Sequence, residues 1–505
     1  MKTTRLPNLF VLLLVFTIIL TPACFTSSNP ETVINLRLNS FALVLSPLKI
    51  VDVQSLSVAS LLYAPLVSVD INGTIDSRLA QDVVRIDKNT LEFHLKRGVT
   101  FSNGTPVLAA DVVSSICAAM QPSSPWAWAL ESIRHEIDSE NNNVICTGVT
   151  AKDDYTVQII EDEPVDWLLH ALDGPPGWIV PSKVKEGAYG VLPSSGPYTL
   201  GKVVSDVSVE LIPRKDGTAI SPKADKIIFK YIPDPGQAAQ MFMNGEIDVL
   251  NLNSPLLIDL IIDPENSKKI KNSIGYSIRA ESEQIRVVIL NENSLSSKGL
   301  TQEQIKCFKD LLNTNIDRQK IVHLSRGLLD EPIYSAYPFY YQNIDDMDIC
   351  PLERAQKLPN FRVTIITESD PFSDSIAQII KNSRLEKVTL DYQAIDKGLL
   401  IQRLVNKNYD LASILIDGNI KSPKYWASFF TPGSPFTVFG KSLPELKNMN
   451  PEYPNNLIKI GKIINQDGNW IAIVKERRIL AVNSKISGLR LTPSGQPRYE
   501  NISTK

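Results

Sequence analysis

The sequence predicts an exported α/β protein with two or three domains. Its 505 residues, 43% of them hydrophobic, are enough to form more than one core. Segments with the alternating pattern of half-buried strands, such as residues 33–38 and 90–96, are interspersed with amphipathic helical patterns, such as residues 55–67. An apolar run of the export-signal type stands near the N-terminus. Together these observations indicate an α/β fold outside the cytoplasm.

Residues 1–24 are typical of a secretory signal peptide. Lys2 and Arg5 precede a continuous apolar run at residues 9–20, and small residues follow up to Cys24. This run is shorter than the roughly 20 residues that a membrane-spanning helix needs. Cys24 resembles the lipidated cysteine of a bacterial lipobox, so we expect a lipid anchor there, with residues 25–32 as a polar tether. A soluble secreted protein cleaved nearby is the alternative.

Four further cysteines suit an oxidising compartment, and sequence alone allows three pairings among them. They are Cys117, Cys146, Cys307 and Cys350. The local choices join the first to the second and the third to the fourth, each within one candidate domain. Four buried free thiols are the alternative. None of the four stands in CxxC spacing, so we expect no zinc or redox site.

Charge and motifs exclude several classes of function. The formal net charge is -3 with both signs interspersed, which argues against a nucleic-acid partner. The sequence contains no GxSxG, HExxH, GxGxxG or P-loop motif, so it does not indicate an enzyme. Its four histidines lack metal-ligand spacing. We therefore expect neither a cofactor nor a resident metal ion.

An ordered series of motifs begins with the predicted strand at residues 90–96. The strand runs into Gly98-Val99 and Phe101, a turn follows at Asn103-Gly-Thr-Pro106, and a helix starts near residue 109. This order closely resembles the family-5 extracellular solute-binding proteins, the peptide- and nickel-type receptors of ABC importers. Further matches to that family are Ser195-Gly-Pro-Tyr198, Gly245-Glu-Ile-Asp248 and Asn315-Ile-Asp-Arg318. The resemblance spans roughly residues 33–491.

The resemblance implies a two-lobe, periplasmic-binding-protein-like (Venus-flytrap) fold with an inserted subdomain. Lobe I would combine residues 33–50, 186–275 and 476–505, and the inserted subdomain would be residues 51–185. Lobe II would be residues 276–475, opened by a strand at residues 286–291. Two strands crossing between the lobes, near residues 275 and 476, would form the hinge.

The resemblance also implies a function. A monomeric receptor would capture a small solute, first of all a peptide, in the interlobe cleft and deliver it to an inner-membrane ABC permease. The ligand would contact both lobes only in the closed state and so shift the open–closed equilibrium. The alternative is a non-transport envelope lipoprotein, a sensor or scaffold, that kept the fold with a degenerate ligand site.

The candidate ligand loop departs from the family pattern. Peptide-binding members carry a loop of the form D-x-a-x-x-GW-x-AD, whose last aspartate pairs with the peptide α-ammonium group. Residues 410–420 match it, but Leu415 and Ile416 replace the Gly-Trp and Asn419 replaces the aspartate. That change removes a charge-assisted hydrogen bond. Asp417 could supply the charge, because residues two apart face the same way in an extended segment; a solvated or capping aspartate is the alternative.

Two aromatic residues follow the loop. Tyr425 and Trp426 could line the ligand pocket, because such rings combine apolar area with a polar tip. Packing in the core or between the lobes is the alternative. The candidate ligand-binding residues are therefore Ile416, Asp417, Gly418, Asn419, Tyr425 and Trp426.

Overall fold

The structure is a computed structural model of the whole chain. It describes residues 31–505 apart from residues 42, 51, 71–73, 163, 166–167, 253–254, 263–264, 266–267, 269–274, 326–328, 341–348, 370, 384, 396, 418–422, 433, 452 and 492–496. Cys24 and the predicted signal peptide lie outside these residues. Residues 32–505 form one compact unit. Of the residues described, none belongs to a helix long and apolar enough to cross a membrane.

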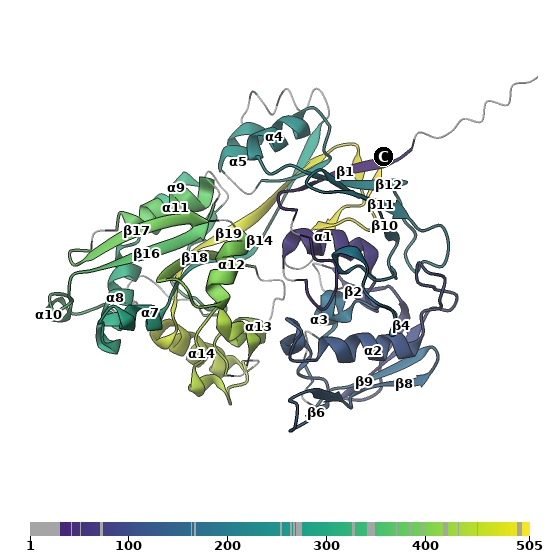
Figure 1. The fold of residues 1–505 in the computed structure, drawn as a ribbon, viewed down its shortest axis with the longest axis horizontal. Coiled ribbons are helices and arrows are strands. Elements are labelled where there is room, and N and C mark those ends of the chain that lie inside the picture. Colours follow the sequence, from purple (N-terminus) through teal and green to yellow (C-terminus); the bar gives the residue numbers. More distant parts are fainter. Residues whose placement is uncertain are drawn as a thin grey trace, which may run out of the picture. The chain divides into compact units, whose positions relative to one another are not determined.

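A four-stranded sheet contains the first strand of the described chain. Its order is β1 (Val33–Leu38), β12 (Lys226–Tyr231), β11 (Ser208–Pro213) and β10 (Tyr198–Val204), with β1 parallel to β12 and the other pairs antiparallel. Side chains of β1 alternate between buried and half-buried, as its sequence pattern predicts. The buried ones pack in a core that also takes up Leu61 and Leu62. Strands far apart in the sequence therefore lie side by side in this sheet (Figure 1).

The helix predicted at residues 55–67 is shorter than expected. Helix α1 (Val53–Leu62) begins after Asp52, whose carboxylate accepts hydrogen bonds from the backbone N–H groups of Gln54 and Ser55. It ends at Tyr63, two residues before a proline, where the backbone turns extended. The chain then enters strand β2 (Val67–Val69), which pairs with β3 (Ile75–Ser77).

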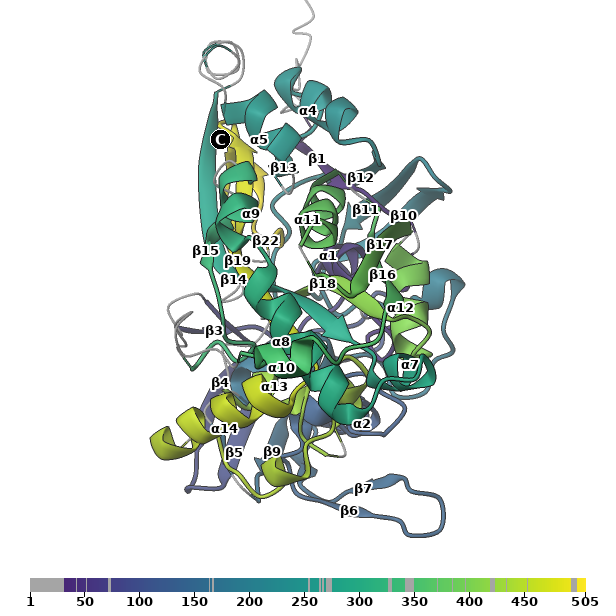
Figure 2. The same cartoon turned by 90° about the vertical axis from the view of Figure 1, so that its left-hand side faces the viewer.

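A second four-stranded sheet, fully antiparallel, contains the strand with the motif pattern. Its order is β4 (Ala80–Arg85), β5 (Thr90–Leu95), β9 (Thr156–Ile160) and β8 (Val149–Asp153). The turn after β5 uses Gly104 at φ +84°, and helix α2 (Ala109–Ala119) follows. Cys117 on α2 is bonded to Cys146 in the hairpin of β6 (His135–Ile137) and β7 (Val144–Cys146). Figure 2 shows this hairpin extending away from the sheet.

The largest sheet has seven strands, and two of them are long. Its order is β13 (Val249–Asn251), β19 (Trp470–Asn483), β14 (Tyr276–Leu290), β18 (Leu411–Asp417), β16 (Phe361–Glu368) and β17 (Val388–Ile395), with β15 (Leu329–Pro332) beside β19. Strand β14 begins ten residues earlier than the expected strand at 286–291. Its first half alternates apolar and polar residues from Tyr276 to Glu281, whereas the expected strand was placed only at the continuous apolar run that follows.

Strands β14 and β19 connect two groups of elements (Figure 1). At one end β19 pairs with β13. Asp248, the residue before β13, accepts a hydrogen bond at 2.8 Å from the backbone N–H of Asn35 on β1. Leu480 and Val482 of β19 belong to the core of the β1 sheet. At the other end β14 pairs with β18. The chain therefore crosses twice between the two groups.

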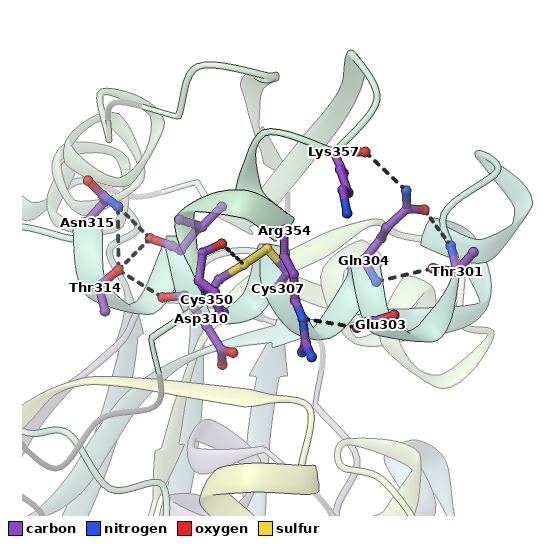
Figure 3. Close-up of a disulfide and its surroundings, with 12 residues drawn as sticks. Thr301, Glu303, Gln304, Cys307, Asp310, Thr314, Asn315, Cys350, Arg354 and Lys357 are labelled. Atoms are coloured by element: carbon purple, nitrogen blue, oxygen red, sulfur yellow. Dashed lines mark hydrogen bonds and ion pairs between the residues drawn. A yellow bond between two sulfur atoms is a disulfide. The ribbon is translucent and has the colours of Figure 1, made fainter.

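A second disulfide fastens the segment after residue 349 to helix α8 (Gln302–Asn315). Cys307 on α8 is bonded to Cys350, just before helix α10 (Leu352–Ala355) (Figure 3). Around it, Arg354 lies 3.1 Å from Glu303, and the Gln304 amide donates to the Lys357 carbonyl at 3.4 Å. Both disulfides of the structure are the local pairings among the four cysteines.

Candidate ligand-binding site

The three parallel strands define a topological switch point. The chain leaves β16 through helix α11 (Pro371–Lys381) to β17 on one side, and returns through helix α12 (Lys397–Val405) to β18 on the other. In open α/β sheets, ligands bind outside the carboxyl ends of the strands where the order reverses in this way. Strand β18 ends at Asp417, the residue that could supply the charge missing at Asn419. The loop chosen from the sequence therefore starts at the edge of the sheet where open α/β folds bind ligands.

The end of β18 is fixed by its neighbour β14. Ile416 lies opposite Ile285, and Asp417 lies opposite Gln284. Ile416 is buried in the cluster that also contains Ile414, whereas Leu415 is partly exposed on the other face. Gly418 and Asn419 follow Asp417 in the sequence and lie outside the described residues. Ile416, one of the expected ligand residues, thus packs in the core and holds the strand that leads into the loop.

Tyr425 and Trp426 are packed among other rings. They lie on helix α13 (Pro423–Ser428) and are 6% and 3% exposed. The Tyr425 ring centroid is 5.5 Å from that of Trp426 and 5.4 Å from that of Phe429, both in edge-on geometry. Phe429 in turn lies 5.0 Å from Trp470 of β19. In this structure Tyr425 and Trp426 therefore pack in the core, which was the alternative to lining a pocket. Their ring contacts hold helix α13 in place next to the loop.

A polar contact joins α13 to the segment after the short helix η1 (Ala127–Leu130). Lys424 Nζ lies 3.9 Å from Glu131 Oε2, and both side chains are partly exposed. Burial raises the pKa of Glu131, and the charge of Lys424 counteracts this effect. Leu130 and Trp426 also belong to one continuous cluster of buried apolar side chains. The elements on both sides of the proposed cleft therefore touch through apolar and charged groups.

A buried ion pair near the switch point was not anticipated from the sequence. Arg286 on β14 donates from Nε to Glu476 Oε1 on β19 at 2.5 Å, and from Nη1 to Ser373 Oγ on α11 at 3.2 Å. The side chains of Arg286 and Glu476 are only 6% and 10% exposed. A charged residue inside an apolar strand was the only signal in the sequence, and it fits a solvent-facing position equally well.

Metal-binding groups and surface pockets elsewhere in the described residues are the remaining candidates for a site. Across the described ranges, no group of three or more His, Cys, Asp or Glu side chains is arranged to hold a metal ion. A surface pocket of about 260 Å³ lies near the end of α8 and the end of α11. It is lined by Asn315, Asp317, Lys320, Ile379, Asn382 and Ser383. This pocket is far in sequence from the candidate loop and contains no buried charged group.

Two long strands that connect two groups of elements are the architecture of the two-lobe binding-protein class. Solved structures share this fold over nearly the whole chain. Haemophilus influenzae OppA in complex with RPPGFSPFR has 17% identity and a TM-score of 0.77, covering 94% of this chain and 99% of that one. The Escherichia coli murein tripeptide binding protein MppA has 16% identity and a TM-score of 0.75, covering 94% and 99%. These likenesses show the fold.

The family follows from the sequence. Residues 74–435 match the model of the bacterial extracellular solute-binding proteins, family 5, and the chain belongs to this family. The Escherichia coli periplasmic oligopeptide-binding protein OppA is 27% identical over 251 residues, 46% of each chain. The Escherichia coli nickel-binding periplasmic protein is 29% identical over 203 residues, 39% of this chain and 37% of its own. The matched segments thus span half or less of these two relatives. The predicted family and two-lobe α/β fold are confirmed.

Proposed function

We propose that this chain is the substrate-binding component of an ABC importer and that it captures a peptide outside the cytoplasm. The observation that carries the proposal is the family match over residues 74–435, which includes β18 and the candidate loop. Relatives with partial matches are named for oligopeptides, dipeptides and nickel. A peptide cargo fits this range best, because a strand end at a switch point offers backbone groups to an extended ligand.

Within this proposal, Asp417, Gly418 and Asn419 contact the ligand, and Ile416, Tyr425 and Trp426 form the apolar wall that holds the loop. The burial of the last three residues supports this division of roles. Asn419 is neutral where peptide-binding family members place an aspartate. The ligand therefore either lacks an obligatory free amino terminus or pairs its ammonium group with Asp417, because a buried ammonium without a counter-charge is strongly disfavoured.

Calorimetric titration with trialanine and N-acetyl-trialanine tests these roles. Asn419→Asp should tighten binding of the free-amine peptide by about 1.5–3 kcal/mol if the new charge-assisted bond forms fully. Asp417→Asn should weaken the same peptide only if Asp417 already pairs with the amine. Equal binding of both peptides by the parent and both variants would mean that the loop does not read an amine, and the peptide assignment would then fall.

A non-transport envelope lipoprotein is the second candidate function. The replacement of Gly-Trp by Leu415 and Ile416, together with Asn419, favours it, because a degenerate loop is what a receptor without cargo would accumulate. Native mass spectrometry of protein purified without unfolding, followed by thermal-shift screening of peptides, sugars and metal complexes, separates the two. A stabilising solute supports transport, and none across all three classes supports the sensor or scaffold.

The proposal extends to the location and organisation of the chain. Residues 1–24 act as a signal peptide with a lipid on Cys24, residues 25–32 as a tether, and the mature protein is a monomer on the outer side of the membrane. Lobe I comprises residues 33–50, 186–275 and 476–505 with the subdomain 51–185 inserted, and lobe II comprises residues 276–475. Cys24→Ser should release the protein from the membrane fraction, because a single unlipidated chain has no stable anchor.

A further inference from the structure

The two strands that connect the lobes are not paired continuously. Residues 276–281 of β14 pair with residues 478–483 of β19, and pairing resumes only where Gln284 faces Glu476. Between these stretches two residues of β14 stand opposite one of β19, which is a β-bulge. A second shift follows directly after Arg286, where the partner changes from Val474 to Ala472. A bulge leaves backbone groups unpaired and bends the strand, so residues 282–283 are a place where the ribbon can flex. At the second shift β14 remains paired with β18, from Gln284 to Leu290.

The buried ion pair lies in the short paired stretch between the two irregularities. This stretch comprises residues 284–286 of β14 and 474–476 of β19. The Arg286–Glu476 bond joins the two strands across it, and the bond from Arg286 to Ser373 joins them to helix α11. Charge-assisted bonds of this kind are among the strongest side-chain contacts. The ion pair thus fastens three elements beside the bulge at residues 282–283, where the pairing between β14 and β19 is interrupted.

The same stretch adjoins the candidate ligand strand. Gln284 pairs with Glu476 on one side and with Asp417 on the other. Asp417 at the end of β18 therefore lies in one row with Glu476 of the ion pair, with Gln284 of β14 between them. Movement of the stretch 284–286 would carry the end of β18 with it.

We propose that Arg286 and Glu476 are positioning residues for ligand capture. They hold the stretch 284–286 and 474–476 rigidly on α11, so that bending between the lobes is confined to the bulge at residues 282–283. The end of β18 then keeps its orientation while the lobes move. The ligand part of this inference rests on the proposed function, whereas the mechanical part concerns the hinge alone.

Distances between the lobes test the mechanical part without any ligand. Spin labels are placed at the exposed positions Lys202 and Lys459 as cysteines, in a Cys24→Ser background with both disulfides intact. Glu476→Gln should at least double the width of the measured distance distribution, because the bend is no longer confined. The matched control is Glu500→Gln, which breaks the Arg78–Glu500 pair at 3.4 Å, where the side chains are 9% and 7% exposed. It should lower stability without broadening the distribution.

Two outcomes would overturn the inference. One is an unchanged distribution in folded Glu476→Gln, and the other is equal broadening in the Glu500→Gln control. Hydrogen exchange of the unmodified protein gives a test that does not depend on a variant folding: amides at residues 284–286 should exchange at least tenfold slower than those at 282–283, and equal rates refute the clamp. If the parent fails to bind trialanine, the proposed function is weakened while the hinge result stands.

Discussion

Lys309 is a buried cation whose ammonium group donates to backbone carbonyls. It lies on α8, and its Nζ donates to the carbonyls of Asn465, at 2.9 Å, and Gly468. These carbonyls stand at the C-terminal end of helix α14 (Pro454–Asp467), which carries partial negative charge. Burial nevertheless lowers the pKa of Lys309 from 10.5 to about 8. The amine of Lys309 therefore loses its proton at a lower pH in the folded protein than in the unfolded chain.

The sign and size of the effect on stability follow from linkage. Because the pKa is lower in the folded state, the unfolded chain binds more protons between pH 8 and 10.5, and the free energy of unfolding rises with pH in that window. The full difference corresponds to ~3.4 kcal/mol at 1.36 kcal/mol for each pH unit. This contribution is present above pH 10.5 and is lost as the pH falls through about 8. Between pH 7 and 9.5 the expected gain is ~2 kcal/mol.

Urea unfolding, followed by tryptophan fluorescence at intervals from pH 7 to 9.5, measures this gain. The parent should become more stable by ~2 kcal/mol, and Lys309→Met should lose the rise, because it removes the titrating group. Lys459→Met, an exposed lysine on α14, should keep it. Burial raises the pKa values of Tyr63, Tyr337 and Tyr409. These tyrosines lower the free energy of unfolding only as the pH rises past 10, so the measured pH range ends at 9.5. A rise that persists in Lys309→Met would refute the reasoning.

Two further predictions concern contacts and covalent links. Lys424→Glu should weaken trialanine binding about two- to fivefold in calorimetric titration, which is the effect expected for a partly exposed ion pair. Adding Glu131→Lys should restore the affinity. An unchanged affinity in Lys424→Glu would contradict a role of this ion pair in closing the two lobes. Peptide mapping of the exported protein without reductant should recover the two local disulfides of the structure, since each joins segments that already pack together; any cross-linked peptide between the two pairs would exclude that arrangement.

The elements with strong local patterns were predictable from the sequence. Strand β1 has the predicted bounds of residues 33–38, and strand β5 ends one residue before the expected position. Both alternate apolar and polar side chains, so their period alone identifies them. The first half of β14 was missed although it alternates apolar and polar residues from Tyr276 to Glu281, because the strand was assigned from the family match that begins at Arg286. The pairing of residues 276–281 with β19 shows that the strand starts earlier.

The position of the ligand site stays a prediction. The loop at 410–420 was chosen because the family motif is contiguous, and strand β18, which leads into it, ends where the strand order reverses. The Arg286–Glu476 pair joins residues 190 positions apart, so no local pattern contains it. Each of these charges, taken alone in its strand, fits a solvent-facing residue. Only the fold, by bringing Arg286 against both Glu476 and α11, turns two ordinary surface signals into a buried bond beside the candidate ligand strand, and hence into a hypothesis about how capture is controlled.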